Sequence, residues 1–238
     1  MRKRTLITGA SRGLGLALSR ALAADGWELI IDARGERALQ AAADELGRTA
    51  TVHAVPGDIA DDRHRRDLVD TVDGLGGGID LLVHNASLLG PSPQPSVSEY
   101  PLGELERVYA ANVFGPMRLT QLLLPCMDAG ARIISITSDA AVEPYEGWGG
   151  YGSSKAALEQ WTRVLAAERP ELRVYVVDPG DMRTQMHQDA FPGEDISDRP
   201  PPETSVPGLL TVIEGDLPSG RYEARTLAPA EVTTGVAS

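Results

Sequence analysis

A tyrosine and a lysine lie four residues apart at Tyr151 and Lys155, a spacing that places both side chains on one face of a helix. A free tyrosine has a pKa of about 10, so it exchanges protons poorly at neutral pH. A nearby ammonium favours the tyrosinate, and lowering the pKa by about two or three units would make the phenol a usable acid/base. Ser138, thirteen residues earlier, could hydrogen-bond a substrate oxygen beside the phenol. Taken alone, each residue also fits ordinary helix or turn structure.

A glycine-rich segment near the N-terminus reads Thr8-Gly9-Ala10-Ser11-Arg12-Gly13-Leu14-Gly15. It follows a short apolar run and opens an amphipathic stretch. Glycines permit a tight turn and let backbone N–H groups approach a pyrophosphate, which the N-terminus of the following helix attracts. The segment is therefore expected to bind a dinucleotide. By the motif alone, a turn that merely joins a strand to a helix remains the alternative.

Short apolar runs alternate with longer amphipathic stretches along the whole chain. This alternation predicts an α/β fold in three layers, a doubly wound parallel sheet with helices on both faces. Residues 1–238 are expected to form a single domain, in which residues 185–215 form a substrate-binding loop or lid. A kink is expected at Gly115-Pro116. The expected strands lie at residues 6–7, 28–31, 51–55, 79–83, 132–136 and 174–177, and the expected helices at 14–24, 37–46, 62–72, 102–127 and 155–167.

Together these motifs resemble the short-chain dehydrogenase/reductase family, in its short single-domain branch, over about residues 5–184. The resemblance rests on the Gly-xxx-Gly-x-Gly loop, Asp58-Ile59, Asn85-Ala86, Asn112, Ser138, Tyr151-xxx-Lys155 and Pro179-Gly180 before Thr184. It implies a Rossmann fold and hydride transfer between a nicotinamide and a carbonyl or alcohol, with Tyr151 as the acid/base. It further implies that Lys155 binds the nicotinamide ribose, Ser138 holds the substrate oxygen and Asn112 anchors a water that resupplies the proton.

The same resemblance implies a set of cofactor contacts and reveals two departures. His84 and Ser87 stand where the family usually has Asn and Gly, and a Cβ at position 87 alters a place where backbone runs close to the nicotinamide. His84 is expected to be a hydrogen-bonded structural residue. The expected contacts are Gly9, Ser11, Arg12, Gly13, Leu14, Gly15, Arg34, Asp58, Ile59, Asn85, Ala86, Tyr151, Lys155, Pro179, Gly180, Met182 and Thr184.

The choice between NADP(H) and NAD(H) depends on the end of the second strand. An acid there binds a ribose 2′-hydroxyl, whereas an arginine accommodates a 2′-phosphate, and the chain offers both Asp32 and Arg34. In the family's register the NAD-selecting acid aligns with Ala33, and Arg34 with Arg12 occupies the basic positions of NADP-preferring members. NADP(H) is therefore expected. A strand that ends one residue earlier would reverse this preference in favour of NAD(H).

The composition of the chain limits the kinds of partner and the cellular location that are expected. The formal net charge of −12 disfavours nucleic acid and anionic membranes, and no apolar run is long enough to span a bilayer. A single cysteine, Cys126, suits a reducing compartment, so a cytoplasmic location is expected. The histidines show no metal-ligand spacing, so no catalytic metal is expected. By resemblance, a homodimer or homotetramer would form through the helices around 102–127 and 151–167.

The substrate side is expected to be mainly apolar, which favours a medium-sized hydrophobic carbonyl compound. Two readings other than a reductase stay open. One is a regulator that senses NADP(H) without turnover, and the other is an isomerase or dehydratase that uses the cofactor transiently. The complete proton-transfer set favours the reductase. The residues expected to line the substrate side are Val142, Pro144, Tyr145, Trp148, Met186, His187 and Phe191.

Overall fold

A single sheet of seven parallel strands forms the centre of the described chain, which in this computed structural model comprises residues 3–227. The strand order is β3-β2-β1-β4-β5-β6-β7, so the direction of winding reverses between β1 and β4. In doubly wound sheets this reversal opens a crevice at the carboxyl ends of the strands. The strands are β1 (Arg4–Ile7), β2 (Glu28–Ala33), β3 (Val52–Pro56), β4 (Leu81–His84), β5 (Arg132–Ile136), β6 (Arg173–Asp178) and β7 (Gly220–Glu223).

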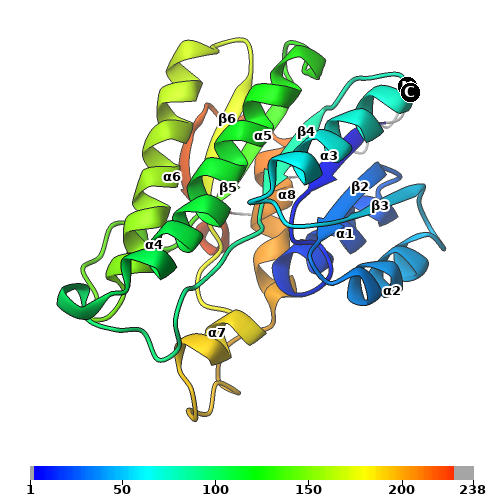
Figure 1. The fold of residues 1–238 in the computed structure, drawn as a ribbon. Helices are drawn as coiled ribbons and strands as arrows, with labels where there is room; N and C mark the ends of the chain where they lie inside the picture. The colour runs from blue at the N-terminus through cyan, green and yellow to red at the C-terminus, as the bar shows by residue number, and fades with distance from the viewer. Residues whose placement is uncertain (1–2, 228–238) are drawn as a thin grey trace.

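Helices cover both faces of the sheet and confirm the predicted three-layer, doubly wound fold (Figure 1). One core cluster joins the sheet to α1, α2 and α8, and the other joins it to α3, α5 and α6. Among the described residues, no helix combines the length and apolar character needed to cross a membrane. The helices are α1 (Gly13–Ala24), α2 (Glu36–Leu46), α3 (Asp62–Gly74), α4 (Leu102–Tyr109), α5 (Gly115–Leu123), α6 (Gly149–Glu168), α7 (Gln185–Ala190) and α8 (Val206–Glu214).

Strand residues alternate between the two core clusters. Leu6 and Ile30 pack toward α3 and α5, whereas their neighbours Ile7 and Ile31 pack toward α1. All four side chains are fully buried. This alternation explains why the strands are continuously apolar in sequence, since a parallel sheet covered on both faces leaves no polar side.

The helix expected over residues 102–127 is interrupted. α4 ends at Tyr109, a π-helical segment follows at Ala110–Phe114, and α5 begins at Gly115. Proline has no N–H and its ring collides with the carbonyl four residues earlier, which for Pro116 is the carbonyl of Asn112. The irregularity therefore lies one turn before the expected kink at Gly115-Pro116, and π-helical segments are frequent at functional sites.

The stretch expected to be a loop or lid, residues 185–215, is only partly a loop. Its first part contains the short helix α7, but its last part is α8, whose Leu209, Val212 and Ile213 are buried against the sheet. A Cβ at Gly208 would overlap the carbonyl of Ala224, so α8 packs against the chain after β7 at backbone distance. A candidate lid is thus confined to about residues 185–205.

Candidate active site

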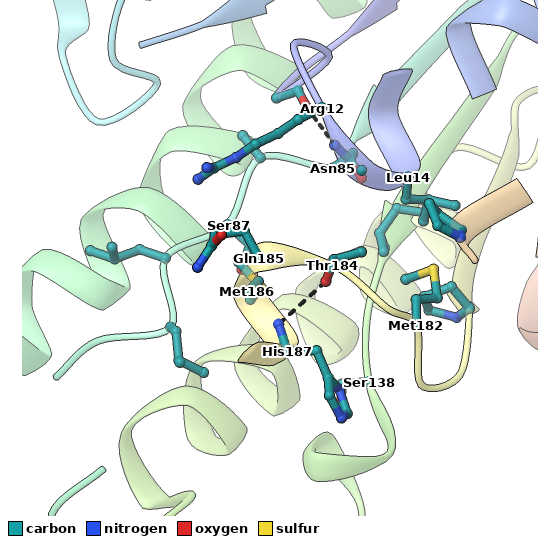
Figure 2. Close-up of a pocket in the computed structure, with 18 of the residues that line it drawn as sticks. Arg12, Leu14, Asn85, Ser87, Ser138, Met182, Thr184, Gln185, Met186 and His187 are labelled. Atoms are coloured by element: carbon teal, nitrogen blue, oxygen red, sulfur yellow. Dashed lines mark hydrogen bonds between the residues drawn. The ribbon is translucent and has the colours of Figure 1, made fainter. Parts of the chain in front are cut away.

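One cavity of about 690 Å³ lies at the carboxyl edge of the sheet. Figure 2 shows side chains of the glycine-rich loop and of the segment around α7 on its walls. All but two of the site residues expected from the sequence line this cavity; Gly15 and Asn112 lie behind its wall. The structure therefore collects at one place residues that lie up to 175 positions apart in the chain, from Gly9 to Thr184.

The glycine-rich loop leaves β1 and enters α1 through two residues with positive φ, Gly9 at +69° and Gly13 at +57°. Only glycine adopts this region without strain, which fixes those two positions. Glycine is required at position 15 for a different reason, which is close packing. A Cβ there would lie 2.5 Å from the side-chain nitrogen of Asn85 and 2.5 Å from the carbonyl oxygen of Gly9. Gly15 allows α1 to approach the end of β4, and it does not itself line the cavity.

Asn85, at the end of β4, holds the loop in place. Its side-chain amide donates to the carbonyls of Thr8 (2.8 Å) and Gly9 (3.1 Å). In return the Thr8 hydroxyl accepts from the backbone N–H groups of Asn85 and Ala86, at 3.0 Å each. Asn85 thus connects the two strands that flank the crevice, and its role here is to position the loop.

Tyr151 and Lys155 lie on α6 one turn apart, as the spacing predicted, and both side chains are buried. The Lys155 ammonium donates to the carbonyl oxygen of Ile136 at 2.9 Å and lies 5.6 Å from the centre of the Tyr151 ring. Burial lowers the pKa of Lys155 to about 8, although the nearby Glu159 carboxylate opposes this. Near pH 8 the lysine therefore changes its charge.

The expected lowering of the Tyr151 pKa is not observed. Burial raises this pKa well above its usual value, and a hydrogen bond from Ser87 only partly opposes the rise. The effect of burial on the Tyr151 pKa is the larger one, because the buried tyrosinate loses its hydration. The Lys155 ammonium donates to a backbone carbonyl instead of to the phenol oxygen. Tyr151 is thus a protonated phenol at neutral pH, suited to donating a proton rather than to accepting one.

Asn112 lies in the π-helical segment, and protein groups use all of its side-chain hydrogen-bonding capacity. Its oxygen accepts from the Leu88 N–H (2.7 Å) and the Ser87 hydroxyl (3.2 Å). Its nitrogen donates to the Leu88 carbonyl and to the Ser154 hydroxyl, both at 2.9 Å. The side chain therefore fixes the π-helical segment between α4 and α5 to the loop after β4 and to α6, and its own polar atoms already have protein partners.

Ser138 follows β5 and lines the cavity. Its hydroxyl donates to the Asp139 carboxylate at 2.8 Å and caps the short turn that follows. Asp139 also accepts from the Tyr145 hydroxyl at 3.0 Å. Sequence reasoning did not single out Asp139, whose position directly after Ser138 was the available signal.

A buried chain of ion pairs next to α6 was also not predicted from the sequence. Glu159, one turn after Lys155, accepts from the Thr137 hydroxyl (2.8 Å) and from Arg221 (3.1 Å). Arg221, on β7, also donates to Asp178 at 3.2 Å, and Asp178 accepts from the N–H of Gly180. The chain connects α6 to the Pro179-Gly180 turn through β7. The one sequence signal was the acid four residues after Lys155.

His84 behaves as the structural residue that was expected. Its ring nitrogen lies 2.7 Å from the Thr120 hydroxyl, and the ring meets Trp161 edge-on. Burial, with Lys155 nearby, lowers the pKa of His84 to about 3, so it stays neutral. Within residues 3–227 no group of three or more His, Cys, Asp or Glu side chains is arranged to hold a metal ion.

The end of the cavity next to the glycine-rich loop and the end of β2 is bordered by two arginines and one buried acid. Arg12 and Arg34 are exposed, and neither guanidinium has an ion-pair partner among residues 3–227. Asp32 is only 1% exposed and accepts hydrogen bonds from the Gly9 N–H at 2.7 Å and from His64 at 2.9 Å. β2 continues through Ala33, so the strand does not end early.

Opposite Tyr151, the cavity wall is apolar and aromatic. Trp148 lies between Tyr151 and Phe191, with ring centres 5.8 and 5.9 Å away respectively. Leu89, Met186 and Ala190 complete the wall. Of the expected substrate-side residues, Trp148, Met186 and His187 line the cavity. Val142 and Tyr145 are exposed outside it, and Pro144 and Phe191 do not line it either.

These residues fit a bound dinucleotide. The loop glycines and the N-terminus of α1 can receive a pyrophosphate, and the cavity runs from there to the buried Tyr151–Lys155 pair. The unpaired arginines add positive charge to the cavity of a protein whose formal net charge is −12. The arrangement can hold a nicotinamide cofactor at the sheet edge with a proton donor beside its reactive end.

Comparisons with known proteins agree with this geometry. The family model described as short chain dehydrogenase matches residues 3–195. A benzil reductase of Saccharomyces cerevisiae that forms (S)-benzoin is 37% identical over 198 residues, which are 79% of this chain and 75% of the relative.

Two solved structures superpose over nearly the whole chain. A short chain dehydrogenase from Pseudomonas syringae has a TM-score of 0.88 at 29% identity and covers 93% of this chain and 94% of its own. One from Shigella flexneri, complexed with NADP, has a TM-score of 0.87 at 28% identity and covers 94% and 97%. With its family motifs gathered around one cavity, this chain belongs to the short-chain dehydrogenase family of oxidoreductases.

Proposed function

We propose that this protein is an NADP(H)-dependent reductase of apolar ketones that carry an aryl group, with Tyr151 as the proton donor. The observation that carries the proposal is the buried Tyr151–Lys155 pair, which shares one cavity with the glycine-rich loop and the apolar wall. The bound nicotinamide supplies the hydride. The residues of the chain orient the substrate, exclude water and deliver the proton.

The raised pKa of Tyr151 suits the direction of reduction. Hydride addition to a carbonyl leaves an alkoxide, which is a stronger base than a phenolate, so a protonated phenol can donate to it even when its pKa is high. On substrate binding, the Ser138 hydroxyl would give up its hydrogen bond to Asp139 and donate instead to the substrate oxygen beside the phenol. Lys155 would add positive charge under the site and donate to the ribose hydroxyls. The reverse reaction needs the tyrosinate, so oxidation is expected only at alkaline pH.

The preference for NADP(H) is supported by the two unpaired arginines and by Asp32. A 2′-phosphate facing Arg12 and Arg34 would form charge-assisted hydrogen bonds, which arginine makes in bidentate geometry. Asp32, the acid that could have favoured NAD(H), already accepts hydrogen bonds from Gly9 and His64. The Shigella flexneri structure with NADP is a related example of this fold with that cofactor.

Replacing Arg34 by Ala is expected to raise the KM for NADPH by about 10- to 100-fold, since a charge-assisted bond contributes about 1.5–3 kcal/mol. The KM for NADH should change by less than about threefold, because NADH has no 2′-phosphate. Steady-state kinetics with both cofactors measure this, and Arg37→Ala serves as the control on the neighbouring helix. Unchanged NADPH kinetics in Arg34→Ala would remove the proposed phosphate contact.

The substrate class is supported by the wall around Tyr151. Trp148, which packs on Phe191 behind it, and Met186 offer flat and polarisable surfaces, and aromatic pairs contribute about 0.5–1.5 kcal/mol beyond area burial. The benzil reductase from yeast acts on a diaryl diketone, as its name states, and is similar over most of this chain. A small anionic or strongly hydrated substrate would leave this wall without a partner.

The test is a panel of carbonyl compounds followed by NADPH absorbance. Benzil and 1-phenylpropane-1,2-dione should be reduced with a kcat/KM at least about tenfold above that of small aliphatic hydroxyaldehydes, a difference of about 1.4 kcal/mol. A preference for the small polar compounds would overturn the substrate class. No turnover on any member, with NADPH still bound, would favour an NADP(H)-sensing regulator instead.

Ser87 offers a prediction about pH. Its hydroxyl donates to the Asn112 oxygen at 3.2 Å, and when Tyr151 ionises the same hydrogen can turn to the tyrosinate and lower the pKa of Tyr151, so Ser87→Ala should raise that pKa further. The alkaline rise of kcat/KM for alcohol oxidation should then shift upward by about 0.5–1 pH unit, the equivalent of one hydrogen bond. Ketone reduction at pH 7, which uses the protonated phenol, should change by less than about threefold.

The control is Ser87→Gly, which restores the residue usual in the family and should shift the oxidation profile as Ser87→Ala does. Identical profiles in the wild type and both variants would show that Ser87 does not act on the phenol.

We also infer a homodimer or homotetramer that works in a reducing compartment such as the cytoplasm. Phe114 (59% exposed) and Val164 (44% exposed) are large apolar residues on the helices expected to form the contact. Cys126 is a free thiol, as a reducing compartment permits.

A further inference from the structure

The carboxylate of Asp32 is held away from the cavity it borders. Its two oxygens are both used, one by the Gly9 N–H at 2.7 Å and the other by a ring nitrogen of His64 at 2.9 Å. Both side chains are nearly inaccessible, Asp32 at 1% and His64 at 4% exposure. Because a carboxylate only accepts, the histidine nitrogen that faces it carries the hydrogen.

His64 reaches Asp32 from the first turn of α3, thirty-two residues away. Gly57, directly after β3, makes room for it, since a Cβ at that position would overlap the imidazole ring. The other ring nitrogen, Nδ1, is buried and has no hydrogen-bond partner among the described residues. The ring is thus placed by packing, and its one polar contact is with Asp32.

The position of this pair bears on cofactor choice, because Asp32 and Arg34 are neighbours on the same wall of the cavity. An ionised carboxylate turned into the cavity would repel a 2′-phosphate and would offer an acceptor to a free 2′-hydroxyl. The two hydrogen bonds to Asp32 stabilise that negative charge and fix the direction of its oxygens. Asp58, which also borders the cavity, adds negative charge on the same side and raises the pKa of Asp32, as burial does.

We propose that His64 selects the cofactor indirectly: by holding Asp32 beneath the glycine-rich loop, it leaves Arg12 and Arg34 as the groups that meet the 2′-position of the adenosine ribose. His64 is a positioning residue in this scheme and does not touch the cofactor. The inference rests on the proposed use of NADP(H) and deepens it.

The test is calorimetric titration of NADP⁺ and NAD⁺ into the wild type and four variants. His64→Leu removes the donor, so Asp32 loses one of its two partners and can turn toward the cavity. NADP⁺ binding should weaken by about tenfold or more, the scale of a lost charge-assisted contact, while NAD⁺ binding weakens by less than about threefold. His64→Gln, which keeps an N–H near the same position, should keep the wild-type ratio of the two affinities.

The double variant Asp32→Asn/His64→Leu distinguishes an effect on cofactor preference from general damage to the fold. It has no carboxylate to release, so NADP⁺ affinity should return to within about threefold of the wild type although the site carries one more substitution. Failure of this rescue, or an unchanged affinity ratio in His64→Leu, would overturn the inference. Circular dichroism and thermal unfolding identify the folded variants.

Asp32→Asn by itself carries the test if His64→Leu does not fold. It keeps an acceptor for Gly9 and should bind both cofactors within about threefold of the wild type, because the acid does not touch the ribose. A loss of NAD⁺ binding in Asp32→Asn would contradict the inference. If the wild type prefers NAD⁺, the proposed use of NADP(H) is overturned but the role of His64 is not. That role is judged by how His64→Leu changes the ratio of the NADP⁺ and NAD⁺ affinities.

Discussion

Replacing Tyr151 by Phe is expected to lower kcat for ketone reduction by about 10²- to 10⁴-fold, the usual contribution of a positioned general acid. Phenylalanine keeps the ring that packs against Trp148, so the wall of the cavity should stay intact. The affinity for NADPH should change by less than about threefold, because the variant keeps Lys155, the loop and both arginines. Stopped-flow single-turnover kinetics with saturating NADPH, together with NADPH fluorescence titration, separate the chemical step from binding.

Trp148→Phe is the matched control, because it alters the same aromatic wall and leaves the phenol in place. It should change the KM for aryl ketones more than the single-turnover rate with NADPH. Equal single-turnover rates in the wild type and Tyr151→Phe would mean that the proton comes from another group, and Ser138 would be the first candidate.

Lys155→Met is expected to lower kcat/KM for NADPH by about 10²- to 10³-fold, as expected when hydrogen bonds from one ammonium to two ribose hydroxyls are lost. Methionine fills similar space and removes a buried charge, but it leaves the Ile136 carbonyl without its donor, which costs about 1–3 kcal/mol. Thermal unfolding should therefore occur at a moderately lower temperature, and the kinetics are compared where both proteins are folded. Lys155→Arg is the matched control: it keeps the charge but cannot fit the same geometry, so it should rescue only part of the loss.

The pH dependence of the wild type checks the same residue. Burial lowers the pKa of Lys155 to about 8, so the ammonium is present below that pH and is lost as the pH rises through it. Since kcat/KM reports groups of the free enzyme, kcat/KM for NADPH should fall above pH of about 8 in the wild type. Lys155→Met should lack this fall. A wild-type profile that stays level up to pH of about 10 would show that the lysine keeps its proton and that its burial has little effect on its charge.

The sequence was sufficient to predict the strands, the glycine-rich loop and the helix that carries Tyr151 and Lys155, because these features depend on residues close together in the chain. Apolar runs of strand length predicted six of the seven strands, and Tyr151 and Lys155 lie one turn apart because four residues make about one turn. The ends of the helices were predicted less accurately. The expected helix at 102–127 is broken where Pro116 cannot bond the carbonyl of Asn112, and the sequence marked this irregularity one turn too late.

What only the tertiary structure decided depends on burial and on partners distant in the chain. Sequence spacing indicated that Lys155 would lower the pKa of Tyr151, but burial raises it, and no local pattern reports how much water a phenol loses. Likewise, Asp32 is a candidate ligand in sequence and a hydrogen-bonded partner of His64 in space. Local periodicity determined which helices and strands form. The environment of each ionisable group, which decides its pKa and its hydrogen-bond partners, depends on how residues from six strand ends meet at one edge of the sheet.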